Sequence, residues 1–154
     1  MKFEENLKKN KLELPKAADP VGSYLATKEV GKLLYISGQI SMDANGNLIK
    51  GKLGKDLTTD EGYEAAARCA LSIISQAKKH LSNDLSKIKN CIKLTGFVNS
   101  TDDFTDQPKV INGASDIMVK IFGDQGKHSR FAIGVASLPR NAPVEVEGIF
   151  EIKN

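Results

Sequence analysis

The feature that most restricts the fold of this chain is a change in the spacing of its apolar residues. From residue 60 to 81, and again from 110 to 121, they recur at every third or fourth position, whereas the flanking segments alternate apolar and polar residues. The first spacing is typical of a helix with one buried face, and the second of β-strands. The sequence therefore predicts an α+β protein with the order β-β-(β)-α-β-α-β-β, in which the bracketed strand is a short one near Leu48.

Both predicted helices have recognisable ends. Thr58 and Glu61 have the spacing of a capping box, so we expect the first helix to begin at about Asp60 and to continue to about Leu81. Gly123 follows the last apolar residue of the second helix and is expected to end it.

The strands surround these helices. Residues 23–40 predict two strands with a turn at Gly31, and residues 88–100 predict another. Two closing segments, 128–138 and 143–152, are separated by four residues, which is a common length for a hairpin turn. We therefore expect the last two strands to pair with each other.

The length of 154 residues suits one domain, which we expect to span residues 20–154. Residues 1–19 form a leader in which the spacing of Phe3 and Leu7 allows a short helix. Two helices can cover only one face of the sheet. The other face carries Phe, Ile and Val side chains, so a closed barrel or a contact between subunits is expected to cover it.

Composition excludes several classes of protein. No apolar run approaches the roughly 18 to 20 residues of a membrane span, and the N-terminus lacks the apolar stretch of a secretory signal. The two cysteines, Cys69 and Cys91, form no metal-ligand pattern, so we expect neither a zinc site nor a disulfide framework, and a cytoplasmic location. The net charge of +3 is too small to indicate a nucleic-acid partner.

Few residues remain as candidates for chemistry. The chain contains far fewer arginines than lysines, and codon bias is the simplest explanation. Alternatively, Arg130 marks a position that needs a planar, forked cation. His128 precedes Arg130 by two positions, so both project from one strand face, and a surface or hydrogen-bonding role for His128 competes with a role at a site. Glu145 and Glu147 share the face opposite two valines, where they form either a solvated edge or part of a polar pocket. We expect His80 to be solvated at a helix end.

Residues 126–152, GKHSRFAIGVASLPRNAPVEVEGIFEI, resemble the C-terminal signature of the Rid/YjgF family of reactive-intermediate (enamine/imine) deaminases. In chain order, that signature consists of a residue with a short side chain and an Arg, then an apolar strand, Leu-Pro, a short turn, and an apolar residue followed by Glu. Residues 23–40 resemble the family's Tyr and Ser-Gly-Gln segment, residues 61–74 its first helix, and residues 92–104 its central strand. The resemblance covers most of the chain, from about residue 20 to residue 152, and points to a longer-chain branch of the family.

The resemblance implies a chorismate-mutase-like fold of the bacillus type, with a mixed sheet and two helices on one face. It also implies a homotrimer in which the sheets form a central barrel and pockets lie between subunits. Arg130 corresponds to the family's carboxylate-binding arginine and Glu145 to the glutamate that positions water. Tyr24 and Ser37 correspond to residues that line the pocket, and Asn112 corresponds more loosely to a pocket asparagine.

Two positions depart from the family pattern. His128 stands where the family usually has a small residue or Pro, so it is expected to narrow the pocket or change the substrate. Ala132 stands where Cys is frequent, which is harmless if that position acts through its backbone.

The implied reaction is the hydrolysis of a small 2-imino or enamino acid to a 2-oxo acid and ammonia, without a metal or other cofactor. An arginine can bind the substrate carboxylate through two parallel N–H···O bonds, and a glutamate can deprotonate the attacking water. Two alternatives stay open. One is a non-catalytic protein that binds small carboxylates or has a regulatory role, and the other is an endoribonuclease or translation inhibitor, for which the small net charge gives little support.

The expected hairpin also makes a prediction about the site. Glu145 would lie opposite about Ala136, which leaves Arg130 six residues farther along the strand, or roughly 20 Å away at the usual rise per residue. The two side chains would share a face without touching. A site that uses both therefore needs a strongly curved sheet or two different subunits.

Overall fold

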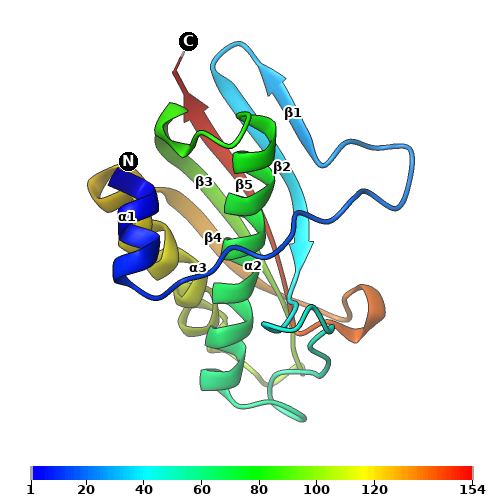
Figure 1. Ribbon diagram of the computed structural model, residues 1–154. Helices are drawn as coiled ribbons and strands as arrows, with labels where there is room; N and C mark the ends of the chain where they lie inside the picture. The colour runs from blue at the N-terminus through cyan, green and yellow to red at the C-terminus, as the bar shows by residue number, and fades with distance from the viewer. Residues whose placement is uncertain (1, 154) are drawn as a thin grey trace.

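The computed structural model describes residues 2–153. In it, five strands form one mixed sheet in the order β1-β2-β5-β3-β4 (Figure 1). The strands are β1 (Thr27–Val30), β2 (Leu33–Ile40), β3 (Ile88–Asn99), β4 (Ser129–Val135) and β5 (Val144–Ile152). The helices are α1 (Lys2–Lys9), α2 (Thr59–His80) and α3 (Gln107–Phe122), with short 3-10 turns η1 (Leu85–Lys87), η2 (Gly123–Gly126) and η3 (Pro139–Asn141). The predicted α+β class is confirmed.

The short strand expected near Leu48 is instead a single bridge between Leu48 and Met42. The other predicted strands and both long helices are present in the predicted order. None of the helices within residues 2–153 is both long and apolar enough to cross a lipid bilayer.

The pairing of the last two strands differs from the prediction. β5 pairs antiparallel with β2 and β3, and β4 pairs with β3 in parallel, so β3 separates β4 from β5 and the expected hairpin is wrong. The connection formed by residues 136–143 crosses the end of β3. There the Asn99 Nδ2 group donates to Asn141 Oδ1 and to the Ala142 carbonyl oxygen, each at 3.2 Å. These bonds fix the turn across the strand, and turn length alone does not reveal them.

α2 and α3 are held at defined positions over the sheet. The Thr58 hydroxyl oxygen accepts from the Glu61 backbone N–H at 3.2 Å, and the Glu61 carboxylate accepts from the Thr58 N–H at 2.7 Å, so the predicted capping box is confirmed. α3 ends at Gly123, as predicted, with a φ of 63°. A Cβ at Gly113 of α3 would overlap the Tyr63 carbonyl group of α2, so only glycine allows the two helices to approach this closely.

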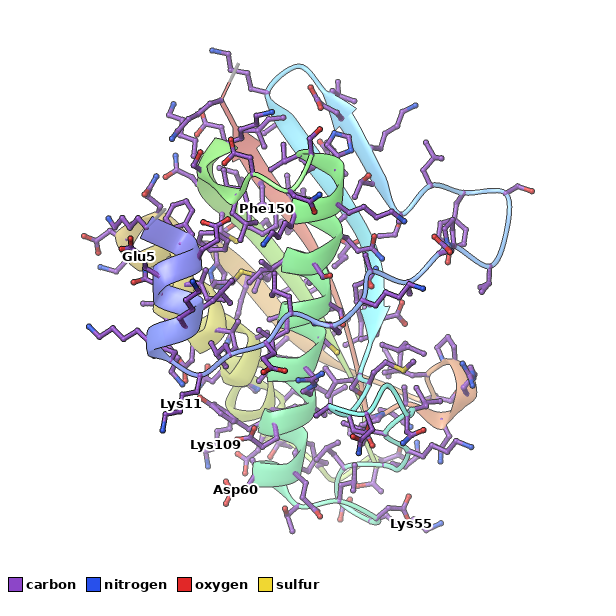
Figure 2. All side chains as sticks on the ribbon, in the orientation of Figure 1. Glu5, Lys11, Lys55, Asp60, Lys109 and Phe150 are labelled. Atoms are coloured by element: carbon purple, nitrogen blue, oxygen red, sulfur yellow. The ribbon has the colours of Figure 1, made fainter. Side chains whose placement is uncertain are left out.

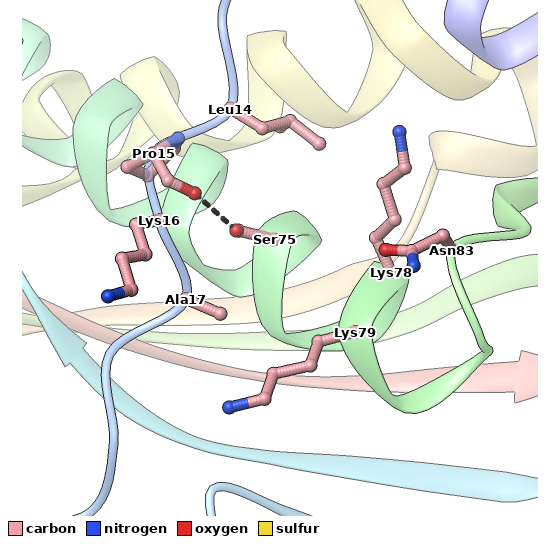
Figure 3. Close-up of a pocket in the computed structure, with 8 residues that line it drawn as sticks. All are labelled: Leu14, Pro15, Lys16, Ala17, Ser75, Lys78, Lys79 and Asn83. Carbon is pink, nitrogen blue, oxygen red and sulfur yellow. Dashed lines mark hydrogen bonds between the residues drawn. The ribbon is translucent and has the colours of Figure 1, made fainter.

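The N-terminal segment packs on the helix layer. Phe3 of α1 meets Phe122 of α3 edge-on, with ring centroids 4.9 Å apart. Phe122 in turn contacts Phe150 of β5 at 5.8 Å, and Phe150 is fully buried between helices and sheet (Figure 2). After α1 the chain crosses the outer face of α2, where the Ser75 hydroxyl donates to the Pro15 carbonyl oxygen (Figures 1 and 3). The helix layer therefore includes a third helix besides the two that cover the sheet.

The opposite face of the sheet carries large apolar side chains in contact with solvent. Tyr35 is 43% exposed, Phe131 46% and Ile133 41%. Phe97 of β3 lies on the same face, because it pairs with Ile133 of β4. An uncovered patch of this kind is typical of a surface that contacts another subunit.

Candidate functional site

Arg130 reaches from β4 to α3, where three groups hold its guanidinium. Its Nη1 atom donates to Asn112 Oδ1 at 2.8 Å and to Ser115 Oγ at 3.0 Å, and its Nη2 atom donates to the Pro108 carbonyl oxygen at 3.2 Å. A guanidinium has five N–H donors, so the Nε–H and one Nη2–H are left over from these contacts. Nε and Nη2 lie along one edge of the group, which is the geometry that binds a carboxylate through two parallel bonds.

Burial lowers the pKa of Arg130 from its ordinary value, and the nearby Asp116 carboxylate opposes this shift. Since an arginine keeps its proton in proteins, Arg130 remains a cation at every pH of interest. The cluster on α3 thus presents a fixed positive charge at the edge of the sheet.

His128 lies just before β4 and joins the same cluster. Its Nε2 atom is 2.9 Å from Ser115 Oγ, and its Nδ1 atom is 2.6 Å from the Gly126 carbonyl oxygen. Burial lowers the pKa of His128, the hydrogen bond to Gly126 opposes the shift, and the charge of Arg130 adds to it. Ala132, two residues beyond Arg130, is partly buried against the core. His128 and Arg130 both contact Ser115, as expected for two side chains that leave the chain on one face.

Glu145 stands on the uncovered face of β5. Gly38 of β2 leaves room for its side chain, because a Cβ at that position would overlap the Glu145 carboxylate. Burial raises the pKa of Glu145, and the neighbouring carboxylate of Glu147 raises it further. No hydrogen bond from another residue of the described chain contributes to this shift. The carboxylate is therefore free to accept a proton.

Tyr24 and Ser37 lie on the side of the molecule that carries Glu145. The Ser37 hydroxyl donates to the Leu25 carbonyl oxygen at 2.7 Å, and Ser37 directly precedes Gly38 in β2. Tyr24 precedes Leu25 in the segment before β1 and is 51% exposed. The structure thus brings neither residue to Arg130 within one chain.

The predicted site residues therefore form two separate groups. We call the first the arginine half, which consists of Arg130, Asn112, Ser115, His128 and Ala132. We call the second the glutamate half, which consists of Glu145, Tyr24, Ser37 and Gly38.

The register of β3 shows how far apart the two halves are. Arg130 pairs with Leu94 of β3, and Glu145 pairs with Phe97 of the same strand. An offset of three residues along the strand and two strand spacings across the sheet place the two Cα atoms about 14 Å apart. Since Leu94 and Phe97 are an odd number of residues apart, their partners leave the sheet on opposite faces. The expectation of a shared face at roughly 20 Å is therefore wrong, because β3 intervenes.

Two residues of these halves, Ser115 and Gly38, were not among the site residues predicted from the sequence. Ser115 follows Asn112 by three positions, so the two share one face of α3, and this spacing was the available signal. Gly38 acts through the space that it leaves, and only the pairing of β2 with β5 reveals its closeness to Glu145.

Two other candidates have structural roles. The Nδ1 atom of His80 is 3.0 Å from Thr27 Oγ1, and its Nε2 atom is 2.8 Å from Glu29 Oε2, so His80 ties α2 to β1 and is not simply solvated. β1 and β4 are opposite edges of the sheet, so His80 and His128 form no acid–base pair within one chain. Cys69 is buried in the core, and burial raises the pKa of its thiol.

Two surface cavities lie away from both halves. One, of about 360 Å³, separates the N-terminal segment from the end of α2 and is bordered by Lys16, Lys78 and Lys79 (Figure 3). The other, of about 450 Å³, lies beside the start of α2 and includes Arg68. Residues of the arginine half and the glutamate half line neither cavity.

Comparison with known proteins identifies the family. Residues 4–151 match the sequence profile described as "YjgF/chorismate mutase-like, putative endoribonuclease", so the chain belongs to the YjgF/Rid family and has its chorismate-mutase-like fold. The match includes most of the leader, residues 1–19, which lies outside the resemblance seen in the sequence.

Relatives of similar length extend over nearly the whole chain. Protein TCP17 of Trypanosoma cruzi is 43% identical over 97% of this chain and 93% of its own length. The Agrobacterium tumefaciens protein Atu1372, described as of unknown function, superposes with a TM-score of 0.90 at 41% identity, covering 99% of this chain and 94% of its own. A Shewanella oneidensis protein described as a "putative endoribonuclease" reaches a TM-score of 0.94 at 35% identity, covering 99% and 100%.

More distant relatives include proteins named for an activity. A Dermatophagoides farinae protein named 2-iminobutanoate/2-iminopropanoate deaminase is 29% identical over 92% of this chain and 95% of its own length. The family thus contains proteins named as imine deaminases and others named as endoribonucleases.

Proposed function

We propose that this protein hydrolyses small 2-imino or enamino acids to 2-oxo acids and ammonia, at sites formed between the subunits of a homotrimer. The observation that carries this proposal is the separation of the arginine half from the glutamate half. Each half contains one of the two groups that the reaction needs, and the pairing of the strands puts them on opposite faces of one sheet. Association of identical chains can bring the arginine half of one chain to the glutamate half of the next.

The arginine half suits the binding of a planar carboxylate. Asn112, Ser115 and Pro108 hold the guanidinium from α3 and leave the edge with Nε and Nη2 for the ligand. Two parallel bonds along this edge would fix the carboxylate and, with it, the adjacent imine carbon. Lysine could not replace this geometry, because it offers a point charge.

The glutamate half suits the activation of water. Glu145 accepts a proton from water while the water oxygen bonds to the carbon of the protonated imine. The electron pair of the C=N bond moves to nitrogen. The Glu145 proton then passes to that nitrogen, which becomes a good leaving group. The C–N bond breaks as the new hydroxyl group returns its proton to Glu145, so that the 2-oxo acid forms and ammonia leaves, taking up the proton from Glu145. A pKa raised by burial brings Glu145 closer to neutral pH, where a general base is most effective.

A second function is favoured by one specific observation, namely that the arginine half is fully assembled without Glu145. A protein that only binds small carboxylates, or that regulates through such binding, would need no more than this half. A relative named "Putative regulator AldR" from Lactococcus lactis is 29% identical over 87% of this chain. Such a protein would bind a 2-oxo acid with the arginine half and release no ammonia.

The test is ammonia release from 2-imino acids that an amino-acid oxidase generates in the assay, with substrates of varied side chain. We expect wild type to accelerate release and Arg130→Ala to abolish the acceleration. Binding of 2-oxo acids without any acceleration for every substrate would support the carboxylate-binding protein instead.

A further inference from the structure

We infer that Ser115 and His128 are positioning residues for Arg130. They hold its guanidinium through a directed chain of hydrogen bonds that forms only while His128 is neutral, so that carboxylate binding weakens as the pH falls. The inference deepens the proposed function, on which it rests for its ligand, a 2-oxo acid. The chain of hydrogen bonds itself is a property of the protein without a ligand.

The direction of each bond follows from what its groups can do. The Gly126 carbonyl oxygen can only accept, so the His128 Nδ1 atom, 2.6 Å away, carries a proton. In a neutral imidazole the Nε2 atom is then an acceptor, and the Ser115 hydroxyl, 2.9 Å away, donates to it. Arg130 can only donate, so the same hydroxyl oxygen accepts from its Nη1 atom at 3.0 Å. Every group in the chain has a partner of the right kind.

Protonation of His128 reverses one link. The Nε2 atom then becomes a donor and can no longer accept from Ser115, so two cations, the imidazolium and the guanidinium, would both donate to one hydroxyl oxygen. Their repulsion favours either the neutral imidazole or a movement of Arg130 away from Ser115. The movement would displace the edge of the guanidinium on which carboxylate binding depends.

The surroundings of His128 offer little to stabilise its charged form. From β4 it faces Arg130, which is a like charge, and from η2 it faces the Gly126 carbonyl oxygen. The carboxylate of Asp116 on α3 acts on the charge of Arg130 and accepts no hydrogen bond from His128. The charge of Lys127 is paired with Asp124 at 2.8 Å. Partial burial is the main effect that disfavours the imidazolium, and the charge of Arg130 adds to it. The two effects outweigh the opposing hydrogen bond to Gly126 and lower the pKa of His128 from its ordinary value of 6.5.

The first experiment needs no ligand. Nitrogen-15 NMR of the imidazole in wild type should show the Nδ1–H tautomer for His128 and a titration below that of a free histidine. In Ser115→Ala the neutral form loses its donor, and in Arg130→Gln it loses the neighbouring cation, so both variants should raise the pKa of His128. His80, which is held by Thr27 and Glu29 away from Arg130, is the internal control, and its nitrogen-15 signals should be the same in all three proteins. An Nε2–H tautomer, or a titration of His128 unaffected by both substitutions, would overturn the inference.

The second experiment measures 2-oxo acid binding by calorimetry at about pH 7.5 and at a lower pH chosen below the His128 titration that the NMR experiment finds. Wild type should bind about tenfold more weakly at the lower pH, the equivalent of one hydrogen bond. Ser115→Ala should lose about tenfold already at the higher pH and little more on acidification. Ser115→Thr keeps the hydroxyl and should restore wild-type behaviour, which a merely structural role for the serine would not explain.

His128→Gln separates the charge from the hydrogen bond. The glutamine oxygen can accept from Ser115 but does not titrate, so the affinity of this variant should be the same at both pH values, whatever its level relative to wild type. Protonation of Glu145 removes a negative charge and so favours a bound anion at lower pH, which opposes the effect expected from His128. The series is therefore repeated in the presence of Glu145→Gln. A pH dependence that persists unchanged in His128→Gln would contradict the inference. If wild type binds no 2-oxo acid at either pH, the proposed function fails, while the NMR titration still decides the hydrogen-bond chain.

Discussion

The arginine half and the glutamate half differ in how completely their key group is held. Three groups of α3 fix the Arg130 guanidinium, whereas the Glu145 carboxylate stands beside the empty space at Gly38. A group that binds a ligand by geometry benefits from being fixed in advance, because the ligand then does not have to order it. A group that takes up and returns a proton benefits from a free oxygen and a raised pKa. Under the proposed function, this contrast suits the first half to binding and the second to proton transfer.

The largest effect should come from the proton-transfer group. Glu145→Gln keeps the shape of the side chain and removes its basicity, so turnover should fall by roughly 10² to 10⁴, while 2-oxo acid binding stays equal or improves because a negative charge is gone. Ammonia release and calorimetry on one preparation measure both quantities. Glu147→Gln is the matched control and should change turnover by no more than about twofold, within the range of a surface substitution. Loss of turnover in the control alone would move the general base from Glu145 to Glu147.

The binding group should show the opposite pattern. Arg130→Lys keeps the charge but loses the fork, so 2-oxo acid affinity should fall by roughly 10- to 100-fold, the cost of one charge-assisted hydrogen bond. Calorimetry measures the affinity, and circular dichroism checks that the fold is kept. Arg140→Lys, in the exposed η3 turn, is the matched control and should bind like wild type. Equal affinity for Arg130→Lys and Arg140→Lys would remove Arg130 from the site.

A smaller effect should follow from filling the space beside Glu145. Gly38→Ala places a methyl group where the Glu145 carboxylate now lies. The Glu145 side chain can move away because its end is flexible. We expect turnover to fall roughly tenfold through misplacement of the base, with binding unchanged. The double variant with Glu145→Gln should be no slower than Glu145→Gln alone, since the two substitutions act on one group. Additive losses would show that Gly38 matters for another reason.

The smallest effect concerns stability. Burial raises the pKa of Glu145 in the folded state, so the folded protein binds this proton more tightly than the unfolded chain, and stability is lost as the pH rises through the folded-state pKa. Glu145→Gln should therefore raise the free energy of unfolding at neutral pH, by less than about 1 kcal/mol because the group is only half-buried. Urea unfolding at neutral and acidic pH measures it. The difference between variant and wild type should close toward acidic pH, and a difference that grows there would contradict the assignment.

Local patterns predicted much of this molecule. The capping box of Thr58 and Glu61 and the stop at Gly123 depend on neighbours in the sequence, so they could be predicted. Arg130 and Glu145 were found through their resemblance to a family signature. The placement of β3 between β4 and β5 could not be predicted, because it depends on the bonds of Asn99 across the end of β3.

The arrangement of the residues within each half could not be predicted from the sequence either. Arg130 reaches Asn112 and Ser115 because the close approach at Gly113 sets α3 beside α2 over the sheet, and no spacing along the chain specifies that approach. Contacts between distant segments therefore had to come from the structure.

The most direct test of the central claim mixes two inactive proteins. Arg130→Ala lacks the arginine half and Glu145→Gln lacks the glutamate half, so neither alone should release ammonia at more than a small fraction of the wild-type rate. Co-expressed in equal amounts, the two chains should form mixed trimers in which about one site in four combines an intact arginine half with an intact glutamate half from the neighbouring chain. We predict that the mixture recovers about a quarter of wild-type activity. A mixture that contains both chains in one trimer and remains as inactive as its parents would show that the site does not lie between subunits.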